Sequence, residues 1–188
     1  MMGEQIKPGG YDLKWVVTDF EEAMKMELDL ECEARNARKA AHLLRFRHNV
    51  KIPRVYDELT CASVMTMALE EGLIKVSDAE ALRASRLNPT QCGTLIAEVF
   101  AEMALVHGHV HGDPHAGNVY LQAPSSSSSD PSSSSSSSSS PTLVILDHGL
   151  YHTIPDSMRE DLCALLLASV SPLSPRSTLQ RLSMRFAG

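Results

Sequence analysis

The sequence predicts an α+β fold in which a few short strands pack on helices. Two observations carry this prediction. Helical hydrophobic spacing recurs in several segments of 12 to 15 residues. The apolar runs between these segments are only three to five residues long, which is the length of a strand and too short for a helix.

Two helices and two strands are expected in the first third of the chain. The apolar positions of residues 13–24 follow helical spacing. Residues 30–44 repeat the pattern, with acidic side chains at the start and basic ones at the end, which complements the helix dipole. Pro53 ends this helix, and the apolar runs 52–56 and 63–67 are expected strands.

The strongest helical pattern follows Asn88-Pro89 after a polar connection. Its apolar side chains run from Leu95 to Val106, and Gly108 is placed as a C-terminal stop. Residues 158–170 are expected to form a late helix, opened by a segment at 153–156 that resembles a capping box.

A serine-rich segment, 123–141, separates two further expected strands, 119–121 and 142–146. The segment has no apolar content to offset the entropy of ordering, so we expect it to be disordered. Loop-closure entropy grows slowly with length, so the two strands can still pair as a hairpin. A solvated insertion is the preferred interpretation, and a phosphorylatable regulatory loop is the alternative.

Composition excludes several classes of protein. Hydrophobic residues make up 43% and charged residues 21% of the 188 positions, which is a globular balance. The net charge of −6 and 5% aromatic content argue against a nucleic-acid-binding protein. Four widely spaced cysteines without a CxxC motif argue against a disulfide scaffold. No apolar run approaches the roughly 18 residues of a membrane span, and no targeting segment is legible.

The segment HGDPHAGN, residues 111–118, carries the main chemical signal. His111, Asp113 and Asn118 have the HxDxxxxN spacing of a kinase catalytic loop. In such a loop the aspartate accepts the proton of the acceptor hydroxyl, and the asparagine holds Mg²⁺. The segment also follows a long helix and precedes a short strand, which is the context that this motif requires.

A second motif, Leu146-Asp147-His148-Gly149, ends the last expected strand. Such a strand end presents a carboxylate to a metal while glycine lets the backbone turn. Without the serine-rich segment, only a hairpin separates Asn118 from Asp147, so the two should meet at one Mg²⁺-phosphate site. The plainer alternative is that both are ordinary turn residues.

Glu33 lies on or beside the apolar face of the expected helix 30–44. A buried carboxylate is costly unless it is paired, and in kinases a helix glutamate pairs with a strand lysine that holds the phosphates. A rim position, with the carboxylate reaching water, is the other interpretation.

A metallo-hydrolase site is a remote alternative for the histidine-rich segment. His109, His111 and Asp113 resemble an HxHxD metal motif, with His107 and His115 beside them. Against it, no downstream His/Asp cluster completes a two-metal site, and the motif does not follow a long buried strand.

Three ordered motifs resemble the UbiB/AarF-domain atypical kinases, also called the ABC-one family. Residues 27–36, ELDLECEARN, are similar to the family signature ELDxxxEAxN. Residues 111–118 resemble its HxDPHPGN loop, with Ala116 in place of proline, and residues 146–149 resemble its LDxG motif in the branch that has DHG. The similarity implies a partial atypical-kinase domain over 11–122 and 142–170, followed by a tail, 171–188.

This resemblance implies a protein-kinase-like fold that binds ATP with Mg²⁺ and acts as a kinase or ATPase. Family members support isoprenoid-quinone and lipid metabolism in mitochondria, plastids or bacteria. It implies that Asp113, with His111, is catalytic, that Asn118 and Asp147 are metal ligands, and that Glu33 is the ion-pair glutamate.

The resemblance also implies a nucleotide site. Glu27 and Asp29 correspond to the family's acidic pair near the nucleotide, and Met67 to the hinge that faces adenine. Ala68 follows where the family usually has glutamate, so a side-chain contact is lost while a backbone contact is expected to remain.

The chain also departs from the family. It has no KxGQ segment and no VAxK-type lysine before Glu33, and it ends soon after Asp147. We therefore expect a partial domain in which Glu33 is unpaired, the isolated chain is poorly soluble, and phosphotransfer is not appreciable. A non-catalytic pseudokinase or binding module is the alternative to a true kinase.

Overall fold

The computed structural model describes residues 16–18, 20, 28–124, 140–171 and 176–185. The main helices of this part of the chain are α2 Leu30–Leu43, α3 Ala79–Ala84, α4 Pro89–Glu102, a π-helical turn Met103–His107, α5 Asp156–Val170 and α6 Arg176–Met184. The strands are β1 Val50–Lys51, β2 Leu73–Lys75, β3 His109–His111, β4 Val119–Gln122, β5 Thr142–Ile145 and β6 Tyr151–Thr153.

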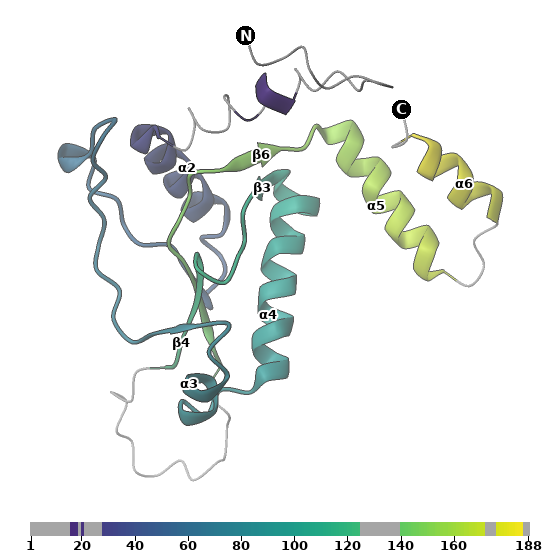
Figure 1. The fold of residues 1–188 in the computed structure, drawn as a ribbon. Coiled ribbons are helices and arrows are strands. Elements are labelled where there is room, and N and C mark those ends of the chain that lie inside the picture. The colour runs from purple at the N-terminus through teal and green to yellow at the C-terminus, as the bar shows by residue number, and fades with distance from the viewer. Residues whose placement is uncertain (1–15, 19, 21–27, 125–139, 172–175, 186–188) are drawn as a thin grey trace, which may run out of the picture.

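Two small sheets form the centre of the fold. One has the strand order β1-β5-β4-β2, in which β1 and β5 are parallel and the other pairs are antiparallel. The other sheet is the antiparallel pair β3 and β6. In Figure 1 the strands run between α2 on one side and α4 on the other, while α5 and α6 project as a helical hairpin.

The core lies where α4 meets the β4–β5 hairpin. Its buried side chains are Leu44, Leu87, Cys92, Leu95, Val99, Met103, Val119, Leu121, Leu143 and Ile145. Each strand of the hairpin contributes alternate positions, as expected for side chains on one face of a sheet. The hairpin is therefore held from one side by α4, and its end carries the segments of interest.

Sequence reasoning found the main helices and the hairpin. Helix α2 matches the expectation for 30–44, and α4 with its π-helical turn matches the run up to Val106. Gly108 ends that helix with a φ of 59°, a left-handed conformation that favours glycine. Strands β4 and β5 pair antiparallel across the serine-rich segment, whose residues 125–139 lie outside the described residues. The expected helix 13–24 also lies mostly outside them.

The expected strands at 52–56 and 63–67 are wrong in detail. The two runs face each other through a single bridge, Val55 to Met67, and neither forms a regular strand, since β1 ends just before the first run. Pro53 has no N–H to donate to a ladder. In addition, the backbone N–H of Thr66 donates to Oγ1 of Thr60 at 3.3 Å, a local bond that occupies a donor which a strand ladder would use.

Three further differences concern short elements and helix ends. The polar connection before Asn88 holds β2 and α3, which the sequence reasoning missed, and the expected tail contains α6. The capping box at 153–156 is also wrong, because Thr153 pairs with His109 in the sheet and Pro155 occupies the N-cap position. Proline offers no side-chain acceptor, so α5 begins without a side-chain cap.

Candidate functional site

The segment 111–118 forms a compact turn between β3 and β4. The backbone N–H of Asp113 donates to Nδ1 of His111 at 3.1 Å, and the N–H of His115 donates to the Asp113 carbonyl at 2.9 Å. Asn118 closes the turn, because its N–H donates to the His115 carbonyl at 3.0 Å and its Nδ2 to the Asp113 carbonyl at 3.3 Å. These bonds are all local to the segment, and together they fix the shape of the turn.

The carboxylate of Asp113 points to the surface. Its side chain is 55% exposed, and Oδ2 lies 3.4 Å from Nε2 of His115, which is exposed to a similar degree. An exposed carboxylate with one exposed neighbour is accessible to a substrate group, which is a requirement for a general base.

Asn118 and Asp147 lie at the same end of the β4–β5 hairpin. Asn118 immediately precedes β4 and Asp147 closely follows β5, and the hairpin pairs Val119 with Ile145. The N–H of Leu146 donates to the Asn118 carbonyl at 3.1 Å, which joins the two segments directly. The predicted hairpin therefore brings the two segments together, and the role of the two side chains as metal ligands stays a prediction.

His148 is the most tightly held residue of the Leu146–Gly149 motif. It is 1% exposed, its Nδ1 lies 2.9 Å from the Tyr151 hydroxyl, and its Nε2 lies 3.2 Å from the Ile145 carbonyl. Its backbone N–H donates to Oε1 of Glu33 at 3.1 Å, and its carbonyl accepts a bond from Nδ2 of Asn36 at 2.9 Å. Both its ring and its backbone are thus anchored by other elements.

The expectation that Glu33 is unpaired is wrong. Its carboxylate is half-buried and accepts the backbone N–H of His148, so α2 contacts the Asp-His-Gly turn directly. Burial raises the pKa of Glu33, the bond from His148 opposes that rise, and the charge of Asp147 adds to it. Helical spacing predicted the correct face of α2 but could not show a backbone partner 115 residues away.

A stacked cluster of rings lies beneath the two loops. The ring of Tyr151 stacks on His109 at 4.4 Å and on His111 at 5.1 Å between centroids, and His148 lies 5.8 Å from the same ring. Burial lowers the pKa of His109 and of His148 to about 4. Burial also lowers the pKa of His111, against the charge of Asp147. These histidines are therefore neutral packing groups at neutral pH.

The geometry does not support the metallo-hydrolase interpretation. His109 and His111 are buried against Tyr151, whereas His115 and Asp113 are at the surface. Within the described ranges, no group of three or more His, Cys, Asp or Glu side chains could hold a metal ion.

The structure describes two of the three residues expected to contact the nucleotide, Asp29 and Met67. Asp29 is the N-cap of α2, where Oδ1 accepts the N–H groups of Glu31 and Cys32. Met67 is paired with Val55, and the N–H of the following Ala68 donates to the Arg54 carbonyl at 2.8 Å, so that donor is already used. Glu27 lies outside the described residues.

Asn36 is a site residue that the sequence reasoning did not single out. It lies one turn after Glu33 on α2 and reaches the same residue, His148. The signal that could have found it was its place in the segment 27–36, at a spacing that puts two polar side chains on one helix face.

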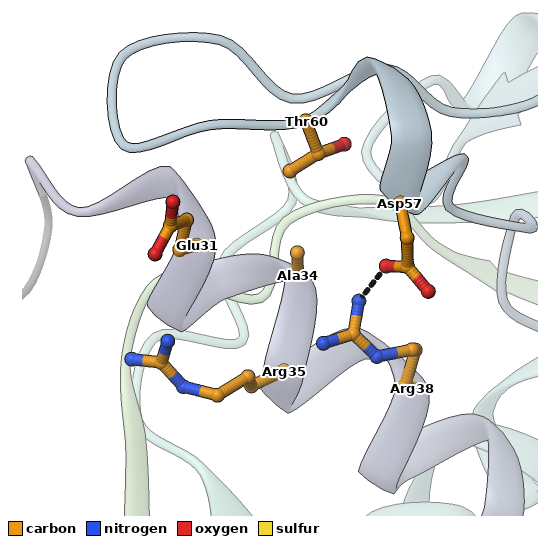
Figure 2. Close-up of a pocket in the computed structure, with 6 residues that line it drawn as sticks. All are labelled: Glu31, Ala34, Arg35, Arg38, Asp57 and Thr60. Atoms are coloured by element: carbon orange, nitrogen blue, oxygen red, sulfur yellow. Dashed lines mark hydrogen bonds and ion pairs between the residues drawn. The ribbon is translucent and has the colours of Figure 1, made fainter.

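The opposite side of α2 carries a pocket of about 290 Å³. Figure 2 shows Ala34 and Arg38 of α2 facing the segment that contains Asp57 and Thr60, with Arg38 paired to Asp57, while the side chain of Arg35 extends away from that segment. Arg35 also lines it and has its own partner, Asp29, at 3.5 Å. Two arginines and two acids, Glu31 and Asp57, give this pocket no net charge.

The arrangement of the two loops, the hairpin and α2 is that of a protein-kinase-like domain. A solved structure from Mycobacterium tuberculosis, the complex of Rv3197 with erythromycin, matches the fold with a TM-score of 0.63. The match covers 95% of this chain and 40% of the other, at 22% sequence identity.

Within that class, the chain belongs to the ABC1 atypical kinase-like family, whose domain model matches residues 2–173. It is 32% identical over 162 residues to AarF domain-containing protein kinase 1 of Xenopus tropicalis, covering 86% of this chain and 28% of that protein. A putative ABC1 protein of Arabidopsis thaliana is 32% identical over 165 residues, covering 85% of this chain and 30% of that protein. The chain thus spans less than a third of the length of these relatives.

The helices that the structure describes include none that is long and apolar enough to cross a membrane.

Proposed function

We propose that this ABC1 domain binds ATP with Mg²⁺ and that the whole protein uses the site for phosphotransfer or ATP hydrolysis. The observation that carries the proposal is the meeting of Asn118 and Asp147 at one end of the β4–β5 hairpin, beside the exposed carboxylate of Asp113. An exposed carboxylate, Asp113, followed along the chain by two oxygen ligands, Asn118 and Asp147, matches the requirements of phosphoryl transfer.

The donor atoms of the site suit Mg²⁺, which prefers oxygen ligands. Asp147 uses Oδ1 to accept the N–H of Gly149 at 2.9 Å, which leaves Oδ2 for a metal. Asn118 donates through Nδ2 to the Asp113 carbonyl, which orients the amide and leaves Oδ1 as its acceptor. A bound Mg²⁺ would neutralise charge on the phosphate oxygens.

Within this proposal one residue of the chain accepts a proton, and others hold the loops of the site in place. Asp113 accepts the proton of the attacking hydroxyl or water at its carboxylate, and His111 fixes the loop by accepting the Asp113 N–H. Glu33 supports the site through His148. Glu27, Asp29 and Met67 remain proposed nucleotide contacts.

The substrate class and cellular place follow from family resemblance alone. We propose a lipid or isoprenoid-quinone-related substrate and a mitochondrial or plastid location. The domain limits, 11–122 and 142–170 with a tail at 171–188, remain proposals as well.

A non-catalytic pseudokinase or binding module is the second candidate. Two observations favour it. Glu33, the family's ion-pair glutamate by resemblance, already bonds the His148 backbone, and the Ala68 N–H bonds Arg54. A domain of this kind would bind nucleotide without turning it over.

The test is calorimetric titration of ATP into the purified chain at increasing Mg²⁺, beside the Asp147→Asn and Asp113→Asn variants. We expect binding that requires Mg²⁺, that Asp147→Asn abolishes and that Asp113→Asn retains. Binding that is independent of both Mg²⁺ and Asp147 would contradict the proposed site. ATP turnover above that of Asp113→Asn would favour the enzyme, and binding without turnover in the full-length protein would favour the pseudokinase.

A further inference from the structure

One face of α2 holds both polar backbone groups of His148. Oε1 of Glu33 accepts the His148 N–H at 3.1 Å, and Nδ2 of Asn36 donates to the His148 carbonyl at 2.9 Å. Residues three apart on a helix are neighbours on its surface, so the two side chains lie side by side. We call this pair of contacts the α2 clamp.

The clamp acts on the two peptide groups that flank His148. The N–H belongs to the peptide that joins Asp147 to His148, and the carbonyl belongs to the peptide that joins His148 to Gly149. The ring of His148 cannot swing to compensate, because it is 1% exposed and both of its nitrogens have partners. The backbone on the C-terminal side of Asp147 is therefore fixed, while β5 fixes the other side.

We propose that Asn36 is a positioning residue for the carboxylate of Asp147, acting through the His148 carbonyl. This inference rests on the proposed function, in which Asp147 is a ligand of Mg²⁺. Without the clamp, the turn could rotate its peptides, and Asp147 would present its free oxygen in several orientations. Binding of Mg²⁺ would then be weaker, because part of its free energy would be used to fix the Asp147 carboxylate in one orientation.

The chemistry at position 36 requires a donor. The carboxamide of Asn36 offers two N–H hydrogens, of which one reaches the His148 carbonyl while Nδ2 also lies 4.0 Å from the Cys32 sulfur. A carboxylate of the same shape has only acceptors, so it would face the His148 carbonyl with no hydrogen to share. It would also add a negative charge beside Glu33 and near Asp147, whose interaction already raises the pKa of Glu33.

Asn36→Asp is therefore the discriminating variant, and Asn36→Ala is the second variant in case the first fails to fold. Asn88→Asp is the matched control, because Asn88 caps α4 by accepting the N–H groups of Thr90 and Gln91, a role that aspartate also performs. All three are made in the 188-residue chain.

Two readouts separate positioning from a general structural role. The first is hydrogen exchange at the Gly149 amide, which belongs to the same peptide group as the His148 carbonyl and donates to Oδ1 of Asp147. We expect this exchange to speed up about tenfold in Asn36→Asp and less in Asn36→Ala, because the peptide group loses its hydrogen bond from position 36. The second is the Mg²⁺ concentration that gives half-maximal ATP binding. We expect it to rise about tenfold in Asn36→Asp, while ATP affinity at saturating Mg²⁺ stays near that of the unaltered chain and of Asn88→Asp.

The outcomes distinguish this inference from the proposed function. If the unaltered chain binds ATP with Mg²⁺ but the Mg²⁺ midpoint is the same in both Asn36 variants, the positioning role is overturned and the function stands. Unchanged exchange at the Gly149 amide in both Asn36 variants overturns the positioning role of Asn36 whether or not ATP binds. A chain that binds no ATP at any Mg²⁺ concentration overturns the function and, with it, the role of Asn36.

Discussion

The two loops that carry the candidate carboxylates are held in opposite ways. The loop of Asp113 is shaped by hydrogen bonds among its own residues, 111–118, and its carboxylate is exposed. The turn of Asp147 is shaped by α2, whose contacting residues are more than 100 positions away in the sequence. One carboxylate is thus positioned by local structure and the other by tertiary structure.

This difference has a physical consequence for stability. Tertiary contacts of the Asp147 turn form only when α2 docks, so the geometry of that turn and the stability of the fold are coupled. The exposed side chains of the other loop, Asp113 and His115, make their polar contacts within that loop, so they can change with little effect on folding. The histidines of the two motifs show the contrast, since His148 is 1% exposed and the side chain of His115 is 57% exposed.

The largest expected effect comes from truncating the buried histidine. His148→Ala removes a buried ring and leaves the Tyr151 hydroxyl and the Ile145 carbonyl without their partner. We expect a loss of roughly 3 kcal/mol in the free energy of unfolding, as for other buried aromatic side chains. Urea unfolding at neutral pH measures it.

The matched control is His115→Ala in the exposed loop, for which we expect a change within about 0.5 kcal/mol. His148→Phe should fall between the two, because it keeps the ring packing but loses both ring hydrogen bonds. Equal losses for His148→Ala and His115→Ala would show that the two loops are held alike.

A smaller loss of stability is expected from a substitution at the contact between the Asp113 loop and the segment that follows the Asp147 turn. The N–H of Gly112 donates to the Leu150 carbonyl at 2.8 Å, and a Cβ at position 112 would lie 2.7 Å from Cγ of Leu150. Gly112→Ala should therefore cost about 1–3 kcal/mol, the usual range for overpacking. Thermal unfolding at fixed protein concentration measures the loss.

Gly93→Ala serves as the comparison for this glycine. It lies inside α4, and a Cβ at this position would have no neighbouring atom within 4 Å, so alanine should stabilise the helix by about 0.5–1 kcal/mol. If Gly112→Ala were also stabilising, the contact between the two loops would be looser than the structure shows.

Local patterns in the sequence were sufficient for the exposed loop but not for the buried turn. The spacing of His111, Asp113 and Asn118 predicted a compact loop before a strand, because such a loop is determined by its own residues. The hairpin end that joins Asn118 to Asp147 was predictable for the same reason, since an antiparallel pair brings its flanking residues together.

The α2 clamp could not be predicted from spacing. Helical periodicity places Glu33 on the inner face of α2, but it does not identify a partner. We therefore expected an unpaired carboxylate, whereas the structure shows one that accepts a backbone N–H. The same limit explains the missed strand β2, a segment of three residues that is held by pairing with β4 and has little pattern of its own. Short elements that depend on tertiary contacts leave weak local signals.

The smallest expected effect is on the pH dependence of stability, and it comes from His109, which is buried beneath the Asp147 turn. His109 is 4% exposed, and neither of its ring nitrogens has a hydrogen-bond partner among the residues that the structure describes. Burial lowers its pKa from 6.5 to about 4, with Lys39 and His107 adding to the shift. Between these two values the unfolded chain binds more protons than the folded one, so stability falls as pH falls.

His109→Phe tests this contribution, because phenylalanine keeps a ring against Tyr151 and removes the titration. Over the first pH unit below the ordinary histidine pKa of 6.5, the unaltered chain should lose about 1 kcal/mol more of its unfolding free energy than the variant does. Glu33 has a raised pKa and contributes with the opposite sign, but it is present in both proteins and cancels in the difference. Urea midpoints at the two ends of this range supply the measurement. Parallel pH curves for the two proteins would mean that His109 takes up protons equally in both states, and that the ring cluster is open to water.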